Sequence, residues 1–294
     1  MTHSHAFMGQ SYYHWHKAVA GIGAYSGLSP PVNTTDENQA DAFNGSRPLA
    51  LVTGVGRTVG IGAGIAHQLA RSGWDIAFTY RNPYDKRMAW GVEPGAIGAL
   101  GHALAERGAS SAAIEADLAD PGAPARIFNE AERQLGSVTA LVMCHCESVD
   151  SGLLDTTVES FDRHFAVNAR ATWLLIREYG LRFRGPYGTG RVVSLTSDHT
   201  VGNLPYGASK GALDRITLAA AQELAHLGVT ANVINPGPID TGWMSQRTQE
   251  RLHQPDAAWP PRHPTGTAHL VDFLCSSQGQ WINGQLLKSN GGFA

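Results

Sequence analysis

Two alternating patterns of apolar residues run along the chain from Pro48 to the C-terminus. Short continuous runs rich in Val, Ile, Leu and Ala are typical of buried parallel strands, and between them apolar residues recur at helical spacing. Strands are predicted at residues 49–53, 75–80, 111–116, 138–144, 190–196, 229–234 and 285–288. Helices are predicted at residues 61–72, 95–107, 122–135, 157–184, 206–227 and 267–276. Strands that alternate with helices predict an α/β fold, a single doubly wound domain whose parallel seven-stranded sheet has helices on both faces.

Two stretches interrupt this alternation. Residues 1–47 combine scattered histidines and prolines with a polar run, so we expect an irregular N-terminal extension before a catalytic domain of residues 48–294. Residues 242–264, rich in Arg, His, Gln, Trp and Pro, separate the last two predicted strands. Because ligands bind beside the carboxyl ends of the strands in such a sheet, this stretch is predicted to be a substrate lid.

Composition narrows the classes of function. The net charge of −3 and the charged fraction of 16% offer no basic field for nucleic acid, and no apolar run has the length of a membrane span. Three cysteines, an odd number in 294 residues, favour a reducing compartment over a disulfide framework. We therefore expect a cytoplasmic protein without nucleic-acid or membrane partners.

A glycine-rich loop follows the first predicted strand. Gly54 ends the strand, and Gly60, Ile61 and Gly62 stand where a helix begins. Glycines let the backbone approach a pyrophosphate, whose charge then lies at the helix N-terminus. This context favours a Rossmann-type nucleotide site over a simple glycine-rich turn.

Tyr206 and Lys210 are four residues apart and therefore share one face of a predicted helix. A free tyrosine titrates near pH ~10, and lowering its pKa to about 7 takes roughly 4 kcal/mol of preference for the phenolate. A lysine charge ~4 Å away supplies about that much at an effective dielectric constant near ~20. The pair can make the phenol an acid at neutral pH, although the same spacing also occurs on solvated helix faces.

Further motifs follow in register: Asn168, Ser197 at the end of the fifth predicted strand, and residues 235–241 after the sixth. Together with the glycine loop and the pair Tyr206 and Lys210, they resemble the short-chain dehydrogenase/reductase family, nearest to its 3-oxoacyl-acyl-carrier-protein reductase-like members. The resemblance covers the chain after the predicted extension. It implies an NAD(P)-dependent oxidoreductase that reduces a ketone or another carbonyl to a secondary alcohol, or catalyses the reverse.

This resemblance assigns four catalytic residues. Tyr206 is the general acid that protonates the carbonyl oxygen as hydride arrives from the nicotinamide. Lys210 lowers the pKa of the tyrosine and hydrogen-bonds the nicotinamide ribose. Ser197 stabilises the developing alkoxide, and Asn168 distorts its helix locally and holds a water of a proton relay.

One departure from the family pattern concerns the serine. The family places it thirteen positions before the tyrosine, whereas Ser197 precedes Tyr206 by nine. Strand alternation puts Ser197 at the strand tip, Ser194 further back toward the interior and Thr196 on the opposite face. We therefore predict a shorter loop with Ser197 as the catalytic serine.

Two arginines bear on the choice of cofactor. An acidic residue at the end of the second strand would favour NAD, but this strand ends in Tyr80 and Arg81, and Asp75 lies at its start. Arg57 and Arg81 offer charge-assisted hydrogen bonds to a 2'-phosphate, which favours NADP(H) over NAD(H). Asp117 matches the adenine-contacting aspartate of the family. The predicted cofactor-binding residues are Gly54, Arg57, Gly60, Ile61, Gly62, Tyr80, Arg81, Asp117, Leu118, Cys144, Tyr206, Lys210, Pro236, Gly237, Ile239 and Thr241.

Two other departures have alternative readings. Met143-Cys-His-Cys146 stands where the family commonly has Asn-Asn-Ala-Gly. Strand alternation sends its middle residue to the opposite face from its neighbours, so we predict no metal site, and a redox-sensitive thiol pair is a weaker alternative. The glycine loop is two residues longer than usual, as in enoyl-reductase branches. Those branches separate their tyrosine and lysine by six residues, and Leu213 at that position disfavours them.

The family commonly assembles through the long helices that carry Asn168 and Tyr206 and through its last strand, so we expect a homotetramer, with a dimer as the alternative. The predicted partner is a small-molecule carbonyl or alcohol substrate, whose identity the sequence leaves open. The competing hypothesis is a catalytically weak nucleotide-binding protein, a regulator or an inactive partner subunit. It rests on the short spacing before Tyr206 and on the altered end of the fourth strand.

Overall fold

The computed structural model describes residues 46–239, 241–242 and 263–292 of the chain. Apart from its last two positions, the predicted extension (1–47) lies outside the described residues. The same holds for the predicted lid (242–264), of which only the two ends are described.

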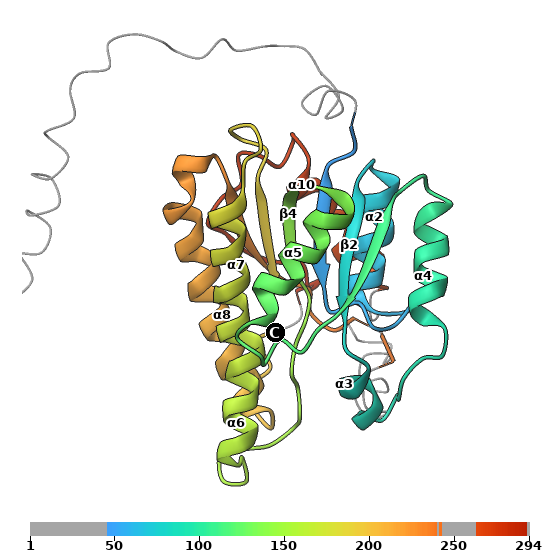
Figure 1. Cartoon of the computed structure of the whole chain (residues 1–294). Coiled ribbons are helices and arrows are strands. Elements are labelled where there is room, and N and C mark those ends of the chain that lie inside the picture. The colour runs from blue at the N-terminus through green and yellow to red at the C-terminus, as the bar shows by residue number, and fades with distance from the viewer. Residues whose placement is uncertain (1–45, 240, 243–262, 293–294) are drawn as a thin grey trace, which may run out of the picture. The chain divides into compact units, whose positions relative to one another are not determined.

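The described part of the chain forms a seven-stranded sheet in which all neighbouring strands are parallel (Figure 1). The strand order is β3-β2-β1-β4-β5-β6-β7. The strands are β1 (Leu49–Thr53), β2 (Asp75–Tyr80), β3 (Ser111–Glu115), β4 (Val138–Met143), β5 (Arg191–Leu195), β6 (Thr230–Asn235) and β7 (Leu286–Lys288). The predicted strands and the doubly wound α/β fold are confirmed, with the strand ends differing by one residue at most.

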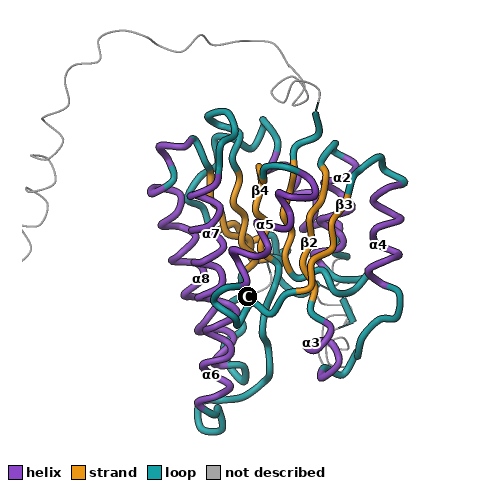
Figure 2. The backbone as a smooth tube through the Cα atoms, viewed as in Figure 1, coloured by secondary structure: helices purple, strands orange, loops and turns teal. Residues whose placement is uncertain are grey.

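Helices cover both faces of this sheet (Figures 1 and 2). The side chains of α2, α4 and α10 pack in one hydrophobic core, and those of α5, α7 and α8 pack in the other. The helices are α2 (Ile61–Arg71), α3 (Asn82–Arg87), α4 (Ala96–Ala105), α5 (Ala123–Leu135), α6 (Val158–His164), the π-helical turn η2 (Phe165–Arg170), α7 (Ala171–Arg182), α8 (Leu204–Glu223), the 3-10 turn η3 (Ala225–Leu227) and α10 (Thr265–Cys275).

The central strand β1 shows why the apolar runs are continuous. Leu49 and Leu51 belong to the core on one face of the sheet, and Ala50 and Val52 belong to the core on the other. Because neither face of a doubly wound sheet meets water, every position of the strand favours an apolar side chain.

Two features differ from the predicted helices. The chain forms the additional helix α3 directly after β2, where Pro83 occupies the first turn. Its six residues, mostly polar, are too short to show an apolar stripe of helical period, so the pattern of the sequence does not reveal it. The long helix predicted at 157–184 is interrupted by η2, which contains Asn168.

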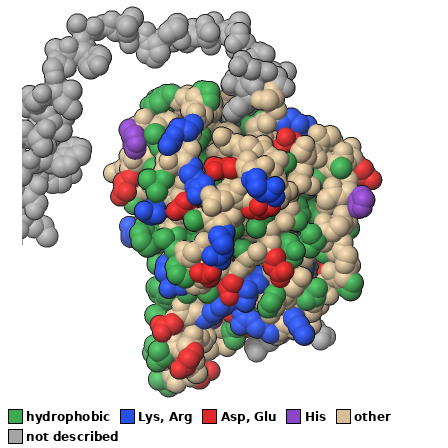
Figure 3. Space-filling view, in the orientation of Figure 1, with side chains coloured by type: hydrophobic (Ala, Val, Ile, Leu, Met, Phe, Trp, Pro, Cys, Tyr) green, Lys and Arg blue, Asp and Glu red, His purple; other side chains and the backbone are tan. Residues whose placement is uncertain are grey.

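Charges on the surface are mixed. Figure 3 shows basic and acidic side chains interspersed over the face that carries α5. Arg126 pairs there with Asp120, and Arg133 pairs with Glu130. Among the described helices, none combines the length and the apolar character that crossing a membrane would require.

Candidate active site

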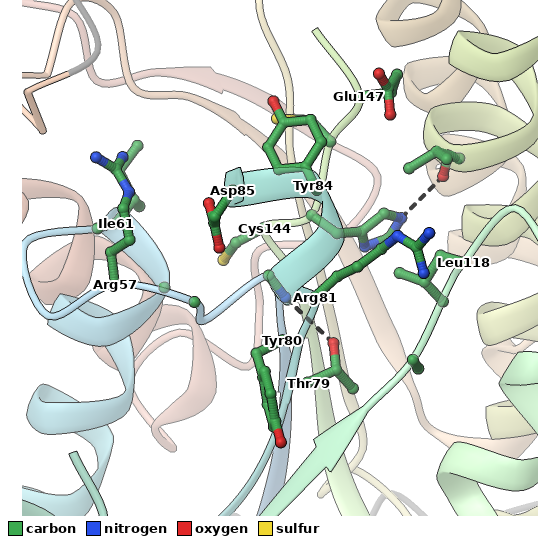
Figure 4. Close-up of a pocket in the computed structure, with 18 of the residues that line it drawn as sticks. Arg57, Ile61, Thr79, Tyr80, Arg81, Tyr84, Asp85, Leu118, Cys144 and Glu147 are labelled. Atoms are coloured by element: carbon green, nitrogen blue, oxygen red, sulfur yellow. Dashed lines mark hydrogen bonds between the residues drawn. The ribbon is translucent and has the colours of Figure 1, made fainter. Parts of the chain in front are cut away.

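A cleft opens at the carboxyl ends of β1 and β4, the two neighbouring strands between which the strand order changes direction. In open α/β sheets ligands bind at such a switch point. Residues predicted to bind the cofactor line this cleft: Gly54, Arg57, Gly60, Ile61, Gly62, Tyr80, Arg81, Asp117, Leu118, Cys144 and Thr241 (Figure 4).

The start of the glycine loop is fixed by contacts between three strands. Gly54 has φ +76°, and a Cβ there would lie 2.6 Å from the backbone of His145 at the end of β4. Its N–H donates to Thr79 Oγ1 at 3.3 Å, and the next N–H, from Val55, donates to the Thr79 carbonyl at 2.7 Å. Only glycine fits such a close approach in a left-handed conformation. The loop therefore leaves the sheet at one defined point on the floor of the cleft.

Other predicted cofactor residues are not among the described residues that line this cleft. They are Tyr206 and Lys210 on α8 and Pro236, Gly237 and Ile239 after β6. Gly237 packs closely on Asn290, and Ile239 is buried. Their roles in cofactor binding stay predictions.

The structure brings Ser197 to Tyr206. Ser197 lies two residues beyond the end of β5, Tyr206 lies in the first turn of α8, and the Ser197 side chain lies close enough to the Tyr206 phenol to act on its pKa. The short connection is possible because it folds back onto the helix at Gly207, where a Cβ would come within 2.7 Å of the His199 carbonyl oxygen. A larger residue after the tyrosine would push this loop away.

Neighbouring polar residues of β5 occupy different positions. Ser194 is fully buried, and its hydroxyl shares a hydrogen bond of 2.7 Å with Thr217 on α8. Thr196 is also buried, whereas Ser197 is half-buried. Of these three, Ser197 is the one that acts on the pKa of Tyr206.

Burial dominates the pKa of Tyr206. It raises this pKa above the ordinary value, the nearby Cys146 thiol adds to the rise, and the interaction with Ser197 works in the opposite direction. That Lys210 lowers this pKa, as expected from the sequence, stays a prediction. A phenol with a raised pKa keeps its proton at neutral pH, so the acid form is available.

Lys210 is buried beneath this tyrosine. Its ammonium lies 5.8 Å from the centre of the Tyr206 ring and donates a hydrogen bond of 2.8 Å to the Leu195 carbonyl at the tip of β5. Burial lowers the pKa of Lys210, while the thiols of Cys144 and Cys146 and the carboxylate of Asp214 favour its charged form. Among the described residues, Lys210 is therefore the cation placed over the Tyr206 ring.

Asn168 ties two elements of the site together. Its Oδ1 accepts from the Glu147 N–H at 2.7 Å, and its Nδ2 donates to the Glu147 carbonyl at 2.9 Å and to Ser209 Oγ at 2.8 Å. Because it lies in the π-helical turn, the predicted local distortion of the helix is present. Its side chain connects the segment after β4 with α8, the helix that carries Tyr206.

Arginines and acids alternate along the rim of the cleft. Asp117 accepts from Arg81 at 2.9 Å and from Arg163 at 3.1 Å, and Arg163 also reaches Glu147, which pairs with Arg87. Burial works to raise the pKa of Asp117, but hydrogen bonds and the two arginine charges outweigh it, so the pKa is lowered. Asp117 and Arg81, both predicted from the sequence, are therefore in direct contact.

Comparison with known proteins bears on this site. A family model described as "Enoyl-(Acyl carrier protein) reductase" matches residues 54–294. The uncharacterized oxidoreductase YjdA of Bacillus subtilis is 33% identical over 250 residues, which cover 83% of this chain and 96% of that protein. The chain belongs to the short-chain dehydrogenase/reductase family.

Solved structures of such proteins have the same fold. A blue fluorescent protein from a metagenomic library, in complex with NADPH, matches with a TM-score of 0.74 at 33% identity, over 85% of this chain and 98% of that one. The angucycline C-6 ketoreductase LanV with bound NADP matches with a TM-score of 0.73 at 28% identity, over 83% and 95% of the two chains. The family resemblance inferred from the motifs is thereby confirmed.

This short-chain dehydrogenase/reductase has cleft residues that the sequence does not reveal. Tyr84, Asp85 and Trp90 reach the cleft from α3 and the turn after it, and Glu147 and Arg163 line its other side. In Figure 4, Asp85 lies on the side of α3 toward Arg57, and Tyr84 lies on the side toward Glu147. The available signal was the long interval between the second strand and the next predicted helix, with a proline that can begin a helix. The remaining lining residues not predicted are Gly56, Thr79, Ala116, His145, Cys146 and Val167.

The altered end of β4 separates its histidine from its cysteines. His145 is buried between Thr53 Oγ1, 2.7 Å from Nδ1, and the Val167 carbonyl, 3.1 Å from Nε2. Cys144 and Cys146 are half-buried free thiols, and burial raises the pKa of both. Over the described ranges, no three His, Cys, Asp or Glu side chains are grouped so as to hold a metal ion.

We expect the buried His145 to make the stability of the family fold depend on pH. Burial, aided by the charge of Lys210, lowers the pKa of His145 from 6.5 to about 3. The unfolded chain binds a proton that the folded chain excludes, so the free energy of unfolding falls by about 1.4 kcal/mol per pH unit below ~6.5, until the pH nears ~3. Urea unfolding measured at pH about 7 and at pH about 5 should show that the free energy of unfolding is about 2 kcal/mol smaller at the lower pH because of this group.

The variant His145→Gln isolates this contribution. It should lose less stability between the two pH values than the wild type, even if it is less stable at both. His102→Gln, on the exposed surface of α4, should retain the wild-type dependence. An equal fall in stability for wild type and His145→Gln would contradict the prediction.

Proposed function

We propose that the protein is an NADP(H)-dependent carbonyl reductase or alcohol dehydrogenase that interconverts a ketone and a secondary alcohol. The observation that supports it best is the proximity of Ser197 to Tyr206 beside the buried Lys210. These side chains combine a proton donor, a second hydroxyl and a cation at the carboxyl ends of β4 and β5, next to a nucleotide-type cleft.

The residues of the cleft fit a dinucleotide. Gly54 keeps its floor free of side chains, and Gly60 and Gly62 stand at the N-terminus of α2, where an anionic pyrophosphate is favoured. Arg57 and Arg81 would face the adenosine end, and Asp117 and Leu118 would border the adenine. A bound nicotinamide cofactor would supply or accept the hydride.

The chain's own residues would manage the proton and the oxygen. Tyr206 would donate its phenolic proton to the carbonyl oxygen of the substrate. Its raised pKa keeps this proton on the phenol at neutral pH. Ser197 would donate a hydrogen bond to the same oxygen and stabilise the negative charge that develops there. Lys210, positioned by the Leu195 carbonyl, would stabilise the phenolate left behind, and Asn168 would hold α8 in register with the segment after β4.

Ketone chemistry fits this site better than enoyl chemistry. Tyr206 and Lys210 stand four residues apart on α8, whereas the enoyl branches separate these residues by six, and Leu213 is fully buried. The similar protein LanV is an angucycline C-6 ketoreductase. The purified chain, supplied with NADPH and a panel of ketones and acyl thioesters, should oxidise NADPH and form secondary alcohols. Turnover of enoyl thioesters alone would contradict the proposal.

The competing hypothesis of a catalytically weak nucleotide-binding protein draws on the short connection before Tyr206. That connection nevertheless brings the Ser197 side chain next to that of Tyr206. The same panel separates the two hypotheses, because a regulator would bind NADPH without oxidising it in the presence of any substrate.

We infer a preference for NADP(H), since both similar structures described above contain it and Arg81 lies at the end of β2 where an acid would select NAD. Asp75 is distant from this end and pairs with Arg47 at 3.2 Å. Arg81→Ala should weaken NADPH binding about tenfold or more and NADH binding little, because a charge-assisted hydrogen bond contributes about 1.5–3 kcal/mol. Fluorescence titration of both cofactors measures the ratio, and an unchanged ratio would reject this role of Arg81.

We also propose a homotetramer in a reducing, cytoplasmic compartment. Apolar side chains of α6 and α7 are exposed in the single chain, among them Phe161, Trp173 and Leu181, and such faces commonly mark subunit contacts. The three cysteines are free. Sedimentation equilibrium of the full chain should give four subunits, and a monomer at micromolar concentration would overturn the assembly.

A further inference from the structure

The segment between β2 and α4 touches the glycine loop at three consecutive residues. Asp85 lies against Gly56, Trp90 stacks on Arg57, and Glu93 accepts two hydrogen bonds from Thr58. We refer to residues 82–95 as the brace. Contacts at three adjacent positions fix the direction of the side chain at the middle one, and that side chain is Arg57.

Arg57 is held from two sides. Its guanidinium carbon lies 4.5 Å from the centre of the Trp90 ring, and its Nη1 donates to the Thr241 carbonyl at 3.0 Å. A planar guanidinium stacked on an indole gains cation–π attraction and loses rotational freedom. An arginine ordered before its ligand arrives loses less entropy on binding, which raises affinity.

Trp90 is itself held in place. Its indole N–H donates to Asp85 Oδ1 at 2.9 Å, and Asp85 is buried. An added Cβ on Gly56 would meet the other Asp85 oxygen at 2.4 Å, so the glycine permits the approach of α3 to the loop. Asp85, Trp90 and Arg57 thus form one continuous chain of contacts, and α3, which carries Asp85, begins directly after Arg81.

Glu93 secures the loop on the far side of Arg57. Its carboxylate accepts from the Thr58 N–H at 2.9 Å and from Thr58 Oγ1 at 2.6 Å. A double hydrogen bond to one residue prevents this stretch of the loop from rotating. Arg57 therefore projects from a backbone that is fixed on both sides.

We infer that Trp90 and Asp85 are positioning residues that orient Arg57 toward a 2'-phosphate and so contribute to the discrimination between NADP(H) and NAD(H). The inference rests on the proposed function, because it requires Arg57 to bind that phosphate. Neither residue needs to touch the cofactor phosphate itself. Their effect acts through the direction of the Arg57 side chain.

Isothermal titration of the full chain with adenosine 2',5'-bisphosphate and with adenosine 5'-monophosphate tests this inference. The two probes differ by the 2'-phosphate alone. Arg57→Ala should weaken the bisphosphate about tenfold or more and leave the monophosphate nearly unchanged. Trp90→Leu should weaken the bisphosphate about three- to tenfold, again with little change for the monophosphate.

Matched variants separate positioning from general damage. Trp90→Phe keeps an aromatic face and should recover most of the lost affinity. Asp85→Ala removes the acceptor of the indole N–H. This variant should bind the bisphosphate about threefold more weakly and the monophosphate as well as the wild type does. Trp281→Leu, at an exposed tryptophan after α10, should change neither probe. In the double variant Arg57→Ala/Trp90→Leu, the loss should match that of Arg57→Ala alone, because both changes remove one interaction.

The outcomes distinguish a failure of the inference from a failure of the proposed function. If Arg57→Ala weakens the bisphosphate but Trp90→Leu and Asp85→Ala do not, the positioning role is wrong and the cofactor assignment stands. If the wild type binds both probes equally and Arg57→Ala changes nothing, the NADP(H) assignment itself fails. Additive losses in the double variant, or equal losses for both probes in Trp90→Leu, would also overturn the positioning role.

Discussion

Tyr206→Phe is expected to lower the kcat of ketone reduction by about a hundred- to ten-thousandfold while NADPH still binds. The hydroxyl is the only group removed, and a positioned general acid contributes about this much to rate. Its loss also leaves Ser197 without its partner at the reacting oxygen. Cofactor affinity should change little, because Tyr206 is not among the described residues that line the cleft.

A second tyrosine provides the matched control. Tyr84 lines the cleft from α3, and burial raises its pKa as it does for Tyr206. Tyr84→Phe should retain most of the activity, because Lys210 and Ser197 lie beside Tyr206, whereas the cation over the Tyr84 ring is Arg87, 5.1 Å from its centre. Steady-state rates with saturating NADPH measure both variants. Equal rates for wild type and Tyr206→Phe would reject the tyrosine as the acid.

The same prediction has a pH dependence with a definite sign. Because burial raises the pKa of Tyr206, the protonated phenol predominates at neutral pH. Ketone reduction, which needs the proton, should stay nearly constant through neutral pH. Alcohol oxidation, which needs the phenolate as base, should rise as the pH increases, and this rise should be absent in Tyr206→Phe.

Ser197→Ala is expected to lower kcat by about a hundred- to a thousandfold with an almost unchanged free energy of unfolding. Removing one hydrogen-bond donor from a developing oxyanion typically costs this much in rate. The side chain is half-buried at the tip of β5, so its loss leaves no buried cavity. Activity and urea unfolding, measured on the same preparation, test both parts of the prediction.

Ser194→Ala is the opposite case on the same strand. Its hydroxyl is buried and bonded to Thr217, so the change should cost about 1 kcal/mol of stability and leave kcat close to wild type. The pair of variants thus separates catalysis from packing. A large loss of kcat in Ser194→Ala with normal rates in Ser197→Ala would show that the catalytic serine is misassigned.

Much of the fold can be predicted from the sequence, for a physical reason. Strands buried on both faces favour apolar side chains along their whole length, as at Leu51 and Val52, so their ends can be predicted to within a residue. The glycine loop and the pair Tyr206 and Lys210 are likewise local, because their geometry depends on a single turn or a single helix. These features also carried the family resemblance, which the comparisons confirm.

The helix α3 shows what a local pattern misses. Its residues Tyr84 and Asp85 have no periodic partners along the chain, and they acquire their places only when α3 folds against the glycine loop and the end of β4. The same is true of Glu147, whose carboxylate is paired with arginines from α3 and α6. Contacts between segments that are distant in sequence do not produce a regular spacing of residues along the chain, so a sequence pattern cannot reveal them.

The sequence by itself determined the succession of strands and helices along the chain, the nucleotide loop and the tyrosine–lysine pair, because each depends on neighbours within a few residues. Only the tertiary structure decided that nine residues suffice to bring Ser197 to Tyr206, since this depends on the loop packing against Gly207. It also decided the burial that raises the pKa of Tyr206, because burial is a property of the assembled fold and not of the single helix that carries the tyrosine and Lys210.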